Sequence, residues 1–143
     1  MKIHTFLKLL SAGICGLAAF LWGSLDGLLR ALIVFMVIDY ITGLMEAYHR
    51  KALSSRTGFM GIFRKGVMLL VVAVGHILDT QVFGAGAVCR SAVIGFYLAN
   101  EGLSILENAG ELGVPLPPVL VRALEQLRHR ADNQTNQEDN DDE

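Results

Sequence analysis

The chain has 143 residues, 52% of them hydrophobic and only 18% charged, a composition that excludes an enzyme with a large soluble core. Its formal net charge of −2 is uneven: residues 131–143 hold six acids and no base, which leaves twelve bases against eight acids elsewhere. These values predict a single all-α membrane domain of a few short passes.

The first apolar run extends from Leu9 to Leu25 and is near the lower limit for a membrane span. Two lysines precede it, as in a secretory signal, and the residues before Cys15 superficially match a lipoprotein cleavage site. Ile14 is too bulky for that site, and further apolar runs follow. We therefore interpret the segment as a retained helix.

The second run, Leu28 to Tyr48, follows a turn at residues 23–27 and has Asp39 almost at its centre. A helix of this length spans about 30 Å, the thickness of the hydrocarbon core of a bilayer. A carboxylate there costs roughly 2.5–3.5 kcal/mol, so Asp39 requires a partner, water or a proton. Glu46 and Arg50 at its end have the i, i+4 spacing of a surface ion pair.

A basic loop follows over residues 49–65, with no acid in it. Basic residues beside spans face the cytoplasm. Phe59, Ile62 and Phe63 make the second half of the loop a candidate interfacial helix. The bases are Arg50, Lys51, Arg56, Arg64 and Lys65.

Residues 66–88 and 89–112 are the third and fourth apolar segments, separated by a predicted bend at Gly84–Gly86. Four passes would put both termini and ten of the twelve Lys and Arg in the cytoplasm, with Arg30 and Arg90 outside. Three passes remain an alternative because these two segments are the weaker spans. In the third segment, Asp79 can pair with His76 at i, i+3.

The last membrane helix has two distinct faces. Its polar residues occupy an arc about 120° wide, whereas small residues gather on the other side, where membrane helices can approach closely. A helix lining a water-filled space needs these two faces, although the last acids could simply lie in the interface. The polar set is Asn100, Glu101, Ser104, Glu107, Asn108 and Glu111, and the small set is Gly95, Ala99 and Gly102.

Three regions follow from these boundaries. Residues 1–112 form the transmembrane helical domain. Residues 113–130 comprise a proline-rich turn, because proline cannot continue a helix, and an amphipathic cytoplasmic helix over 119–130. Residues 131–143 are predicted to be a disordered acidic tail.

The chain has no nucleophile elbow, phosphate loop or zinc spacing. Cys15 and Cys89 lie in separate apolar segments and are interpreted as structural thiols. We therefore predict neither an enzyme nor a protein with a cofactor, a metal site or a nucleic-acid partner.

Three stretches of the chain carry a resemblance to a known family. They are Asp39-Tyr40-Ile41-Thr42-Gly43-Leu44, the basic loop into Gly61–Gly66 with the run ending at Asp79, and Asn100–Ala109 continuing to Pro117. The chain resembles the phage-lysis and toxin-secretion holins, which include holin-like proteins of clostridial toxin loci.

This resemblance implies a protein that accumulates in the bacterial inner membrane and oligomerises with itself. The resulting lesions in the lipid would release an endolysin or a large toxin and cause host-cell lysis. Two features depart from the pattern: the tail is acidic where holins often have a basic one, and the next methionine after Met1 is Met36. A separate antiholin is therefore expected, if the protein has one.

Two other classes stay open from the residues alone. The chain could be a small membrane transporter or ion-channel subunit that uses Asp39 and the His76–Asp79 pair. It could also be a membrane-embedded partner of another protein, without a pore.

Overall fold

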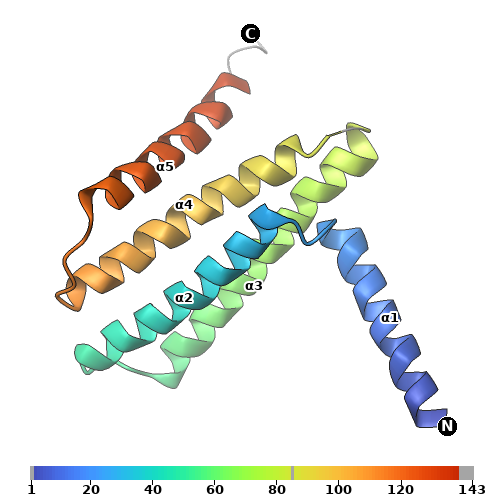
Figure 1. The fold of residues 1–143 in the computed structure, drawn as a ribbon, viewed down its shortest axis with the longest axis horizontal. Helices are drawn as coiled ribbons and strands as arrows, with labels where there is room; N and C mark the ends of the chain where they lie inside the picture. The colour runs from blue at the N-terminus through green and yellow to red at the C-terminus, as the bar shows by residue number, and fades with distance from the viewer. Residues whose placement is uncertain (1, 85, 139–143) are drawn as a thin grey trace.

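The computed structural model describes residues 2–84 and 86–138, which fold into five α-helices with no strand among them. A short π-helical turn extends the third helix (Figure 1). The elements are α1 (Lys2–Trp22), α2 (Gly27–His49), α3 (Ser55–Ile77), η1 (Leu78–Val82), α4 (Val88–Glu111) and α5 (Pro118–Glu138).

Three helical segments are long and apolar enough to cross a membrane: Ile3–Trp22, Gly27–His49 and Ser55–Val82. The predicted all-α membrane fold is thereby confirmed. Helix α4 is also long, at 24 residues, but it is not among these segments, and it contains four charged side chains. They are Arg90, Glu101, Glu107 and Glu111.

Helices α2, α3 and α4 lie side by side and form the bundle of the protein (Figure 1). Its core is aliphatic, and Leu32, Val72 and Ile94, one from each helix, are fully buried. The outward faces of α2 and α3 carry exposed large apolar residues along their length. Such a surface suits contact with lipid rather than with water.

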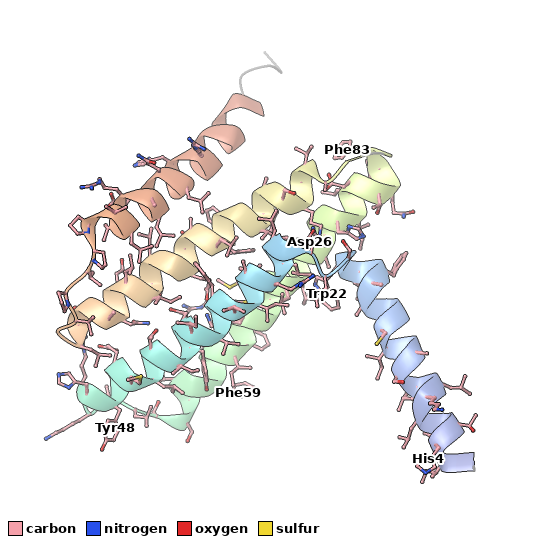
Figure 2. All side chains as sticks on the ribbon, viewed as in Figure 1. His4, Trp22, Asp26, Tyr48, Phe59 and Phe83 are labelled. Carbon is pink, nitrogen blue, oxygen red and sulfur yellow. The ribbon has the colours of Figure 1, made fainter. Side chains whose placement is uncertain are left out.

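Helix α1 leaves the bundle at an angle, with its C-terminal end nearest to the other helices (Figure 1), and Trp22 at that end packs against the core. The Trp22 indole donates a hydrogen bond to the Leu69 carbonyl of α3, with an N–O distance of 2.7 Å. Figure 2 shows Trp22 beside Asp26 at this junction, with Tyr48 at the opposite end of α2. No part of the apolar stretch of α1 is buried, so lipid would have to cover it.

The second half of the basic loop is not a separate interfacial helix. Ser54 caps α3 by accepting a hydrogen bond from the backbone N–H of Thr57, so Phe59, Ile62 and Phe63 belong to the first turns of α3. The predicted bend after the third segment is present. Gly84 and Gly86 have φ values of +74° and +101°, which glycine adopts without strain.

Helix α5 runs back beside α4 and continues to Glu138, eight residues beyond its predicted end at Arg130 (Figure 1). Disorder was expected from residue 131, but no glycine or proline follows Pro118 to stop the helix. Residues 139–143 of the acidic tail lie outside the described residues.

Candidate functional site

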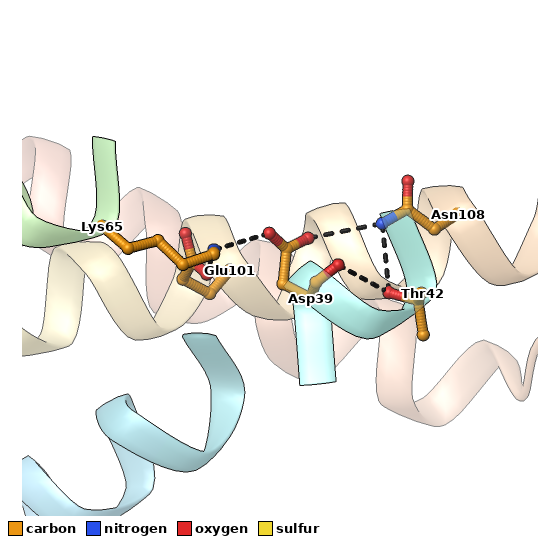
Figure 3. A network of polar contacts seen from close by, with 5 residues as sticks. All are labelled: Asp39, Thr42, Lys65, Glu101 and Asn108. Atoms are coloured by element: carbon orange, nitrogen blue, oxygen red, sulfur yellow. Dashed lines mark hydrogen bonds and ion pairs between the residues drawn. The ribbon is translucent and has the colours of Figure 1, made fainter. Parts of the chain in front are cut away.

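Three charged side chains meet between α2, α3 and α4, and we call Asp39, Lys65 and Glu101 the central cluster (Figure 3). Lys65 Nζ lies 2.7 Å from Asp39 Oδ2 and also forms an ion pair with Glu101 Oε2. The Glu101 side chain is 5% exposed and those of Asp39 and Lys65 are each 16% exposed. The cluster is thus held inside the bundle.

Asn108 extends the central cluster along α4 (Figure 3). Its Nδ2 donates to Thr42 Oγ1 at 3.1 Å and lies 3.4 Å from Asp39 Oδ1, while Thr42 itself donates to the Asp39 carbonyl. Both oxygens of the Asp39 carboxylate therefore have a donor. A buried carboxylate needs such partners because losing water without them is costly.

The charges of the central cluster do not balance, since one ammonium faces two carboxylates. If all three groups are ionised, the cluster itself carries one surplus negative charge, which the more distant Arg64 offsets only in part. Such a charge is expensive at membrane depth and favours any arrangement that brings it a cation, a proton or water.

Of the predicted polar arc, Glu101 and Asn108 join Asp39, whereas Asn100 and Ser104 line a groove beside them and Glu107 is exposed. Glu101 does not face open water in the protomer, because Lys65 covers it. From the sequence, Lys65 was predicted as a base of the cytoplasmic loop that shares a face of the third segment with Asp79. Its 26-residue separation from Asp39 gives no local signal of the contact.

The small face of α4 packs within the protomer. A Cβ atom on Gly102 would lie 2.8 Å from Leu124 of α5 and 3.2 Å from Phe35 of α2, and Ala99 is fully buried. Gly95 has open space where a Cβ would stand. Two of the three predicted packing residues, Ala99 and Gly102, are therefore covered by other helices of the same protomer.

A second group of charges, the junction cluster, consists of Asp26, Asp79 and Arg90 at the α1 end of the bundle. Asp79 accepts hydrogen bonds from the backbone N–H groups of Cys89 and Arg90, at 3.0 and 2.9 Å, and so holds the first turn of α4. Asp79 was predicted to be able to pair with His76; the two interact electrostatically but form no hydrogen bond or ion pair, and the His76 ring lies against Gly23.

The Arg90 side chain ties α4 to the turn between α1 and α2. Its Nη1 lies 2.6 Å from Asp26 Oδ2, and its other nitrogens donate to the carbonyls of Trp22 and Ser24 at 2.9 and 3.0 Å. The hydrogen bond from Arg90, together with that from the Leu29 N–H, lowers the pKa of Asp26 below its usual value. This arginine was expected only as an outside charge.

Of the loop bases, Arg50 pairs with Glu46 and with Glu111, the latter at 2.9 Å, and these pairs raise the pKa of Arg50. Lys51 sits in the turn with a φ of +57°. Arg56, Arg64 and Lys65 instead border a groove of about 600 Å³ between α2, α3 and α4, next to the central cluster.

The amino-acid sequence of the chain matches a known protein family. A model of the bacteriophage holin family matches residues 16–129. An uncharacterised protein of Listeria innocua is 44% identical over 115 residues, covering 78% of this chain and 81% of its own. A 14.9 kDa protein of Clostridium perfringens is 40% identical, covering 80% and 86%.

A relative from a phage carries a functional name. The probable holin of Bacillus phage phi105 is 37% identical over 121 residues, which cover 85% of this chain and 88% of that protein. No solved structure matches the chain.

Proposed function

Because the chain belongs to the bacteriophage holin family, we propose that it oligomerises in the bacterial inner membrane and forms lesions that release an endolysin and cause host-cell lysis. Members of this family are membrane proteins and not enzymes. The function therefore has to come from assembly. The residues that drive assembly are the charged groups that lack a full set of partners when a single protomer lies in lipid.

The central cluster is the observation that carries this proposal. Two carboxylates share one lysine where three helices meet, inside a bundle whose outer face is apolar. An arrangement of several protomers around water would hydrate the surplus charge, whereas an isolated protomer in lipid cannot. Assembly therefore gains free energy from a group that is costly in the monomer.

For topology, we propose four helices at membrane depth with both termini in the cytoplasm. Helix α4 packs against both α2 and α3, two of the three apolar spans, so it lies at their depth despite its charges. Two of its four charged residues, Arg90 and Glu101, are buried inside the protein, each with 4% of the whole residue exposed.

Expression in a bacterium with and without a co-produced endolysin tests the function. We expect growth to stop abruptly after a delay, with release of cytoplasmic protein and loss of turbidity when the endolysin is present. An endolysin that lacks its own export signal should be used, because its escape then depends on the lesion. Growth arrest without release of the endolysin would contradict the proposal.

A small transporter or channel subunit is the second candidate, and the polar groove beside the central cluster is the feature that favours it. A transporter would change ion or solute flux while retaining large proteins. The same experiment separates the two, because a 600 Å³ groove within one protomer cannot pass a folded enzyme.

A further inference from the structure

The groove beside the central cluster has the shape of a site for a flexible ligand. Its volume is about 600 Å³, and its walls come from α2, α3 and α4. Glycines at positions 43, 58 and 61 remove side chains from two of these walls, and the ring of Tyr40 lies against Gly61. The groove is open on one side and mostly apolar, with Leu44 and Met60 among its lining residues.

Two arginines at the groove form no ion pair, although the charge of Arg64 is felt by Glu101 at longer range. Within the described residues, Arg56 and Arg64 are exposed and form neither a hydrogen bond nor an ion pair. Their neighbours on α3 are apolar and also exposed, with Phe59 at 69%, Ile62 at 56% and Phe63 at 60%. A guanidinium on a lipid-facing surface is costly unless an anion accompanies it.

The floor of the groove offers neutral hydrogen-bonding groups. Asn100 and Ser104 line it from α4, and within the described residues neither side chain forms a hydrogen bond. An amide and a hydroxyl can each donate and accept, so they suit a hydroxylated ligand next to the charged one. The groove therefore combines three cations, the two carboxylates of the central cluster, neutral polar groups and an apolar wall, and its charged lining residues sum to one positive charge.

We propose that this groove binds an anionic phospholipid of the surrounding membrane, with the phosphate at Arg56 and Arg64. Hydroxyls of the headgroup reach Asn100 and Ser104, and an acyl segment lies over the glycine-lined wall. Basic pockets between membrane helices recognise anionic headgroups in this way. Lys65 is not part of the phosphate site, because Asp39 and Glu101 already neutralise it.

Lipid binding to the purified full-length protein in detergent tests the proposal, by native mass spectrometry with added phosphatidylglycerol or phosphatidylcholine. We expect a preference for phosphatidylglycerol of about thirtyfold, the worth of two arginines near an anionic headgroup. The double variant Arg56→Gln/Arg64→Gln should reduce the preference to near parity. Arg30→Gln/Arg122→Gln, which removes two exposed charges outside the groove, should keep it.

A second variant distinguishes lipid binding in the groove from non-specific attraction of lipid to the two arginines. Gly61→Leu fills the groove but leaves both arginines, so it should weaken binding of both lipids while the protein keeps its helical circular dichroism. The proposal is overturned if the arginine variant retains the wild-type preference, or if the control loses as much. It is also overturned if the arginine variant instead abolishes a dimer, which would assign these cations to a second copy of the chain.

Discussion

Lys65 is bonded to two carboxylates, and this ratio determines how the central cluster responds to substitution at each of its members. Removing one acid leaves one carboxylate paired with Lys65. Removing the lysine leaves the two carboxylates of Asp39 and Glu101 close together inside the bundle without a cation between them. The two changes therefore act in opposite directions on the stability of the protomer, even though both delete one ion pair.

For Glu101→Leu, we expect a protomer at least as stable as the wild type, because Asp39 and Lys65 remain as a matched pair. The proposed driving force for assembly is then reduced, so lysis should be delayed or lost at unchanged membrane levels. Glu101→Gln, which keeps the hydrogen bond, should be milder. Lysis timing and crosslinked oligomers measure the effect, and normal lysis by Glu101→Leu would remove the argument from surplus charge.

For Lys65→Met, we expect strong destabilisation, since breaking a buried pair costs about 3–5 kcal/mol and both carboxylates lose their cation. Thermal unfolding in detergent should show it as a large drop in the unfolding temperature. The double variant Lys65→Met/Glu101→Gln should recover part of that loss. A single variant as stable as the wild type would mean that the acids are protonated or hydrated without the lysine.

Asp26 gives the junction cluster a pH dependence of known sign. Its pKa is lower in the folded chain than in the unfolded chain, so its contribution to stability is present above the unfolded pKa of about 3.9. That contribution is lost as the pH falls through the folded pKa. We expect Asp26→Asn to lower the unfolding temperature at pH 7 and to differ less from the wild type at pH 3.

The matched control for this titration is Glu125→Gln on the exposed face of α5. It removes an acid that is outside both clusters and should leave the pH dependence unchanged. A gap between Asp26→Asn and the wild type that stays constant from pH 7 to pH 3 would assign the effect to packing rather than to the ion pair with Arg90.

Among the elements, α2, the turn before it and the end of α4 could be predicted from the sequence, because apolar length, glycine and proline act locally. The start of α3 could not, since Arg56, Arg64 and Lys65 look like loop bases until α3 is seen to pack them beside the acids of α2 and α4. The ion pairs of Lys65 with Asp39 and Glu101 are tertiary contacts, and no local pattern in a single sequence predicts them.

The contact between α4 and α5 can be broken at one residue. In Gly102→Leu, the new side chain meets Leu124 and Phe35, so α5 should detach from α4. The expected cost is about 1–3 kcal/mol, typical of overpacking. Trypsin should then cleave after Arg122, Arg128 or Arg130 faster than in the wild type.

Gly95→Leu is the control for this substitution, because it lies on the same helix with open space around it. Its α5 should be cleaved at the wild-type rate. Equal cleavage of Gly102→Leu and the wild type would show that α5 does not depend on this contact.

At the scale of the whole molecule, the protomer combines two parts with different needs. The bundle has its own core and two internal charged clusters, whereas α1 is tied to it at one end and has no buried stretch. Helix α1 therefore depends on lipid, or on another helix, to cover its apolar surface. The orientation of all these helices across the membrane decides which ends of the bundle meet the cytoplasm.

Labelling of single cysteines tests the proposed orientation, in a variant whose Cys15 and Cys89 are replaced by alanine. Ser55 and Ala87 mark opposite ends of the α3–η1 segment, and Asn136 lies in α5. Ala87 is preferable to Gly86, whose φ of +101° would strain a cysteine. An impermeant thiol reagent, applied to spheroplasts before any lesion forms, should label only position 87.

Position 136 is the most informative of the three, because α5 runs beside α4 toward the end where α4 begins (Figure 1). If α5 crossed the membrane in that position, its arginines and acids would enter the hydrocarbon core, and α5 is not among the segments apolar enough to span. We therefore expect α5 to leave its position beside α4 when the bundle is in a membrane and to stay on the cytoplasmic side, with position 136 labelled only after permeabilisation. Labelling at 136 from outside would place α5 across the membrane beside α4 and overturn the cytoplasmic C-terminus.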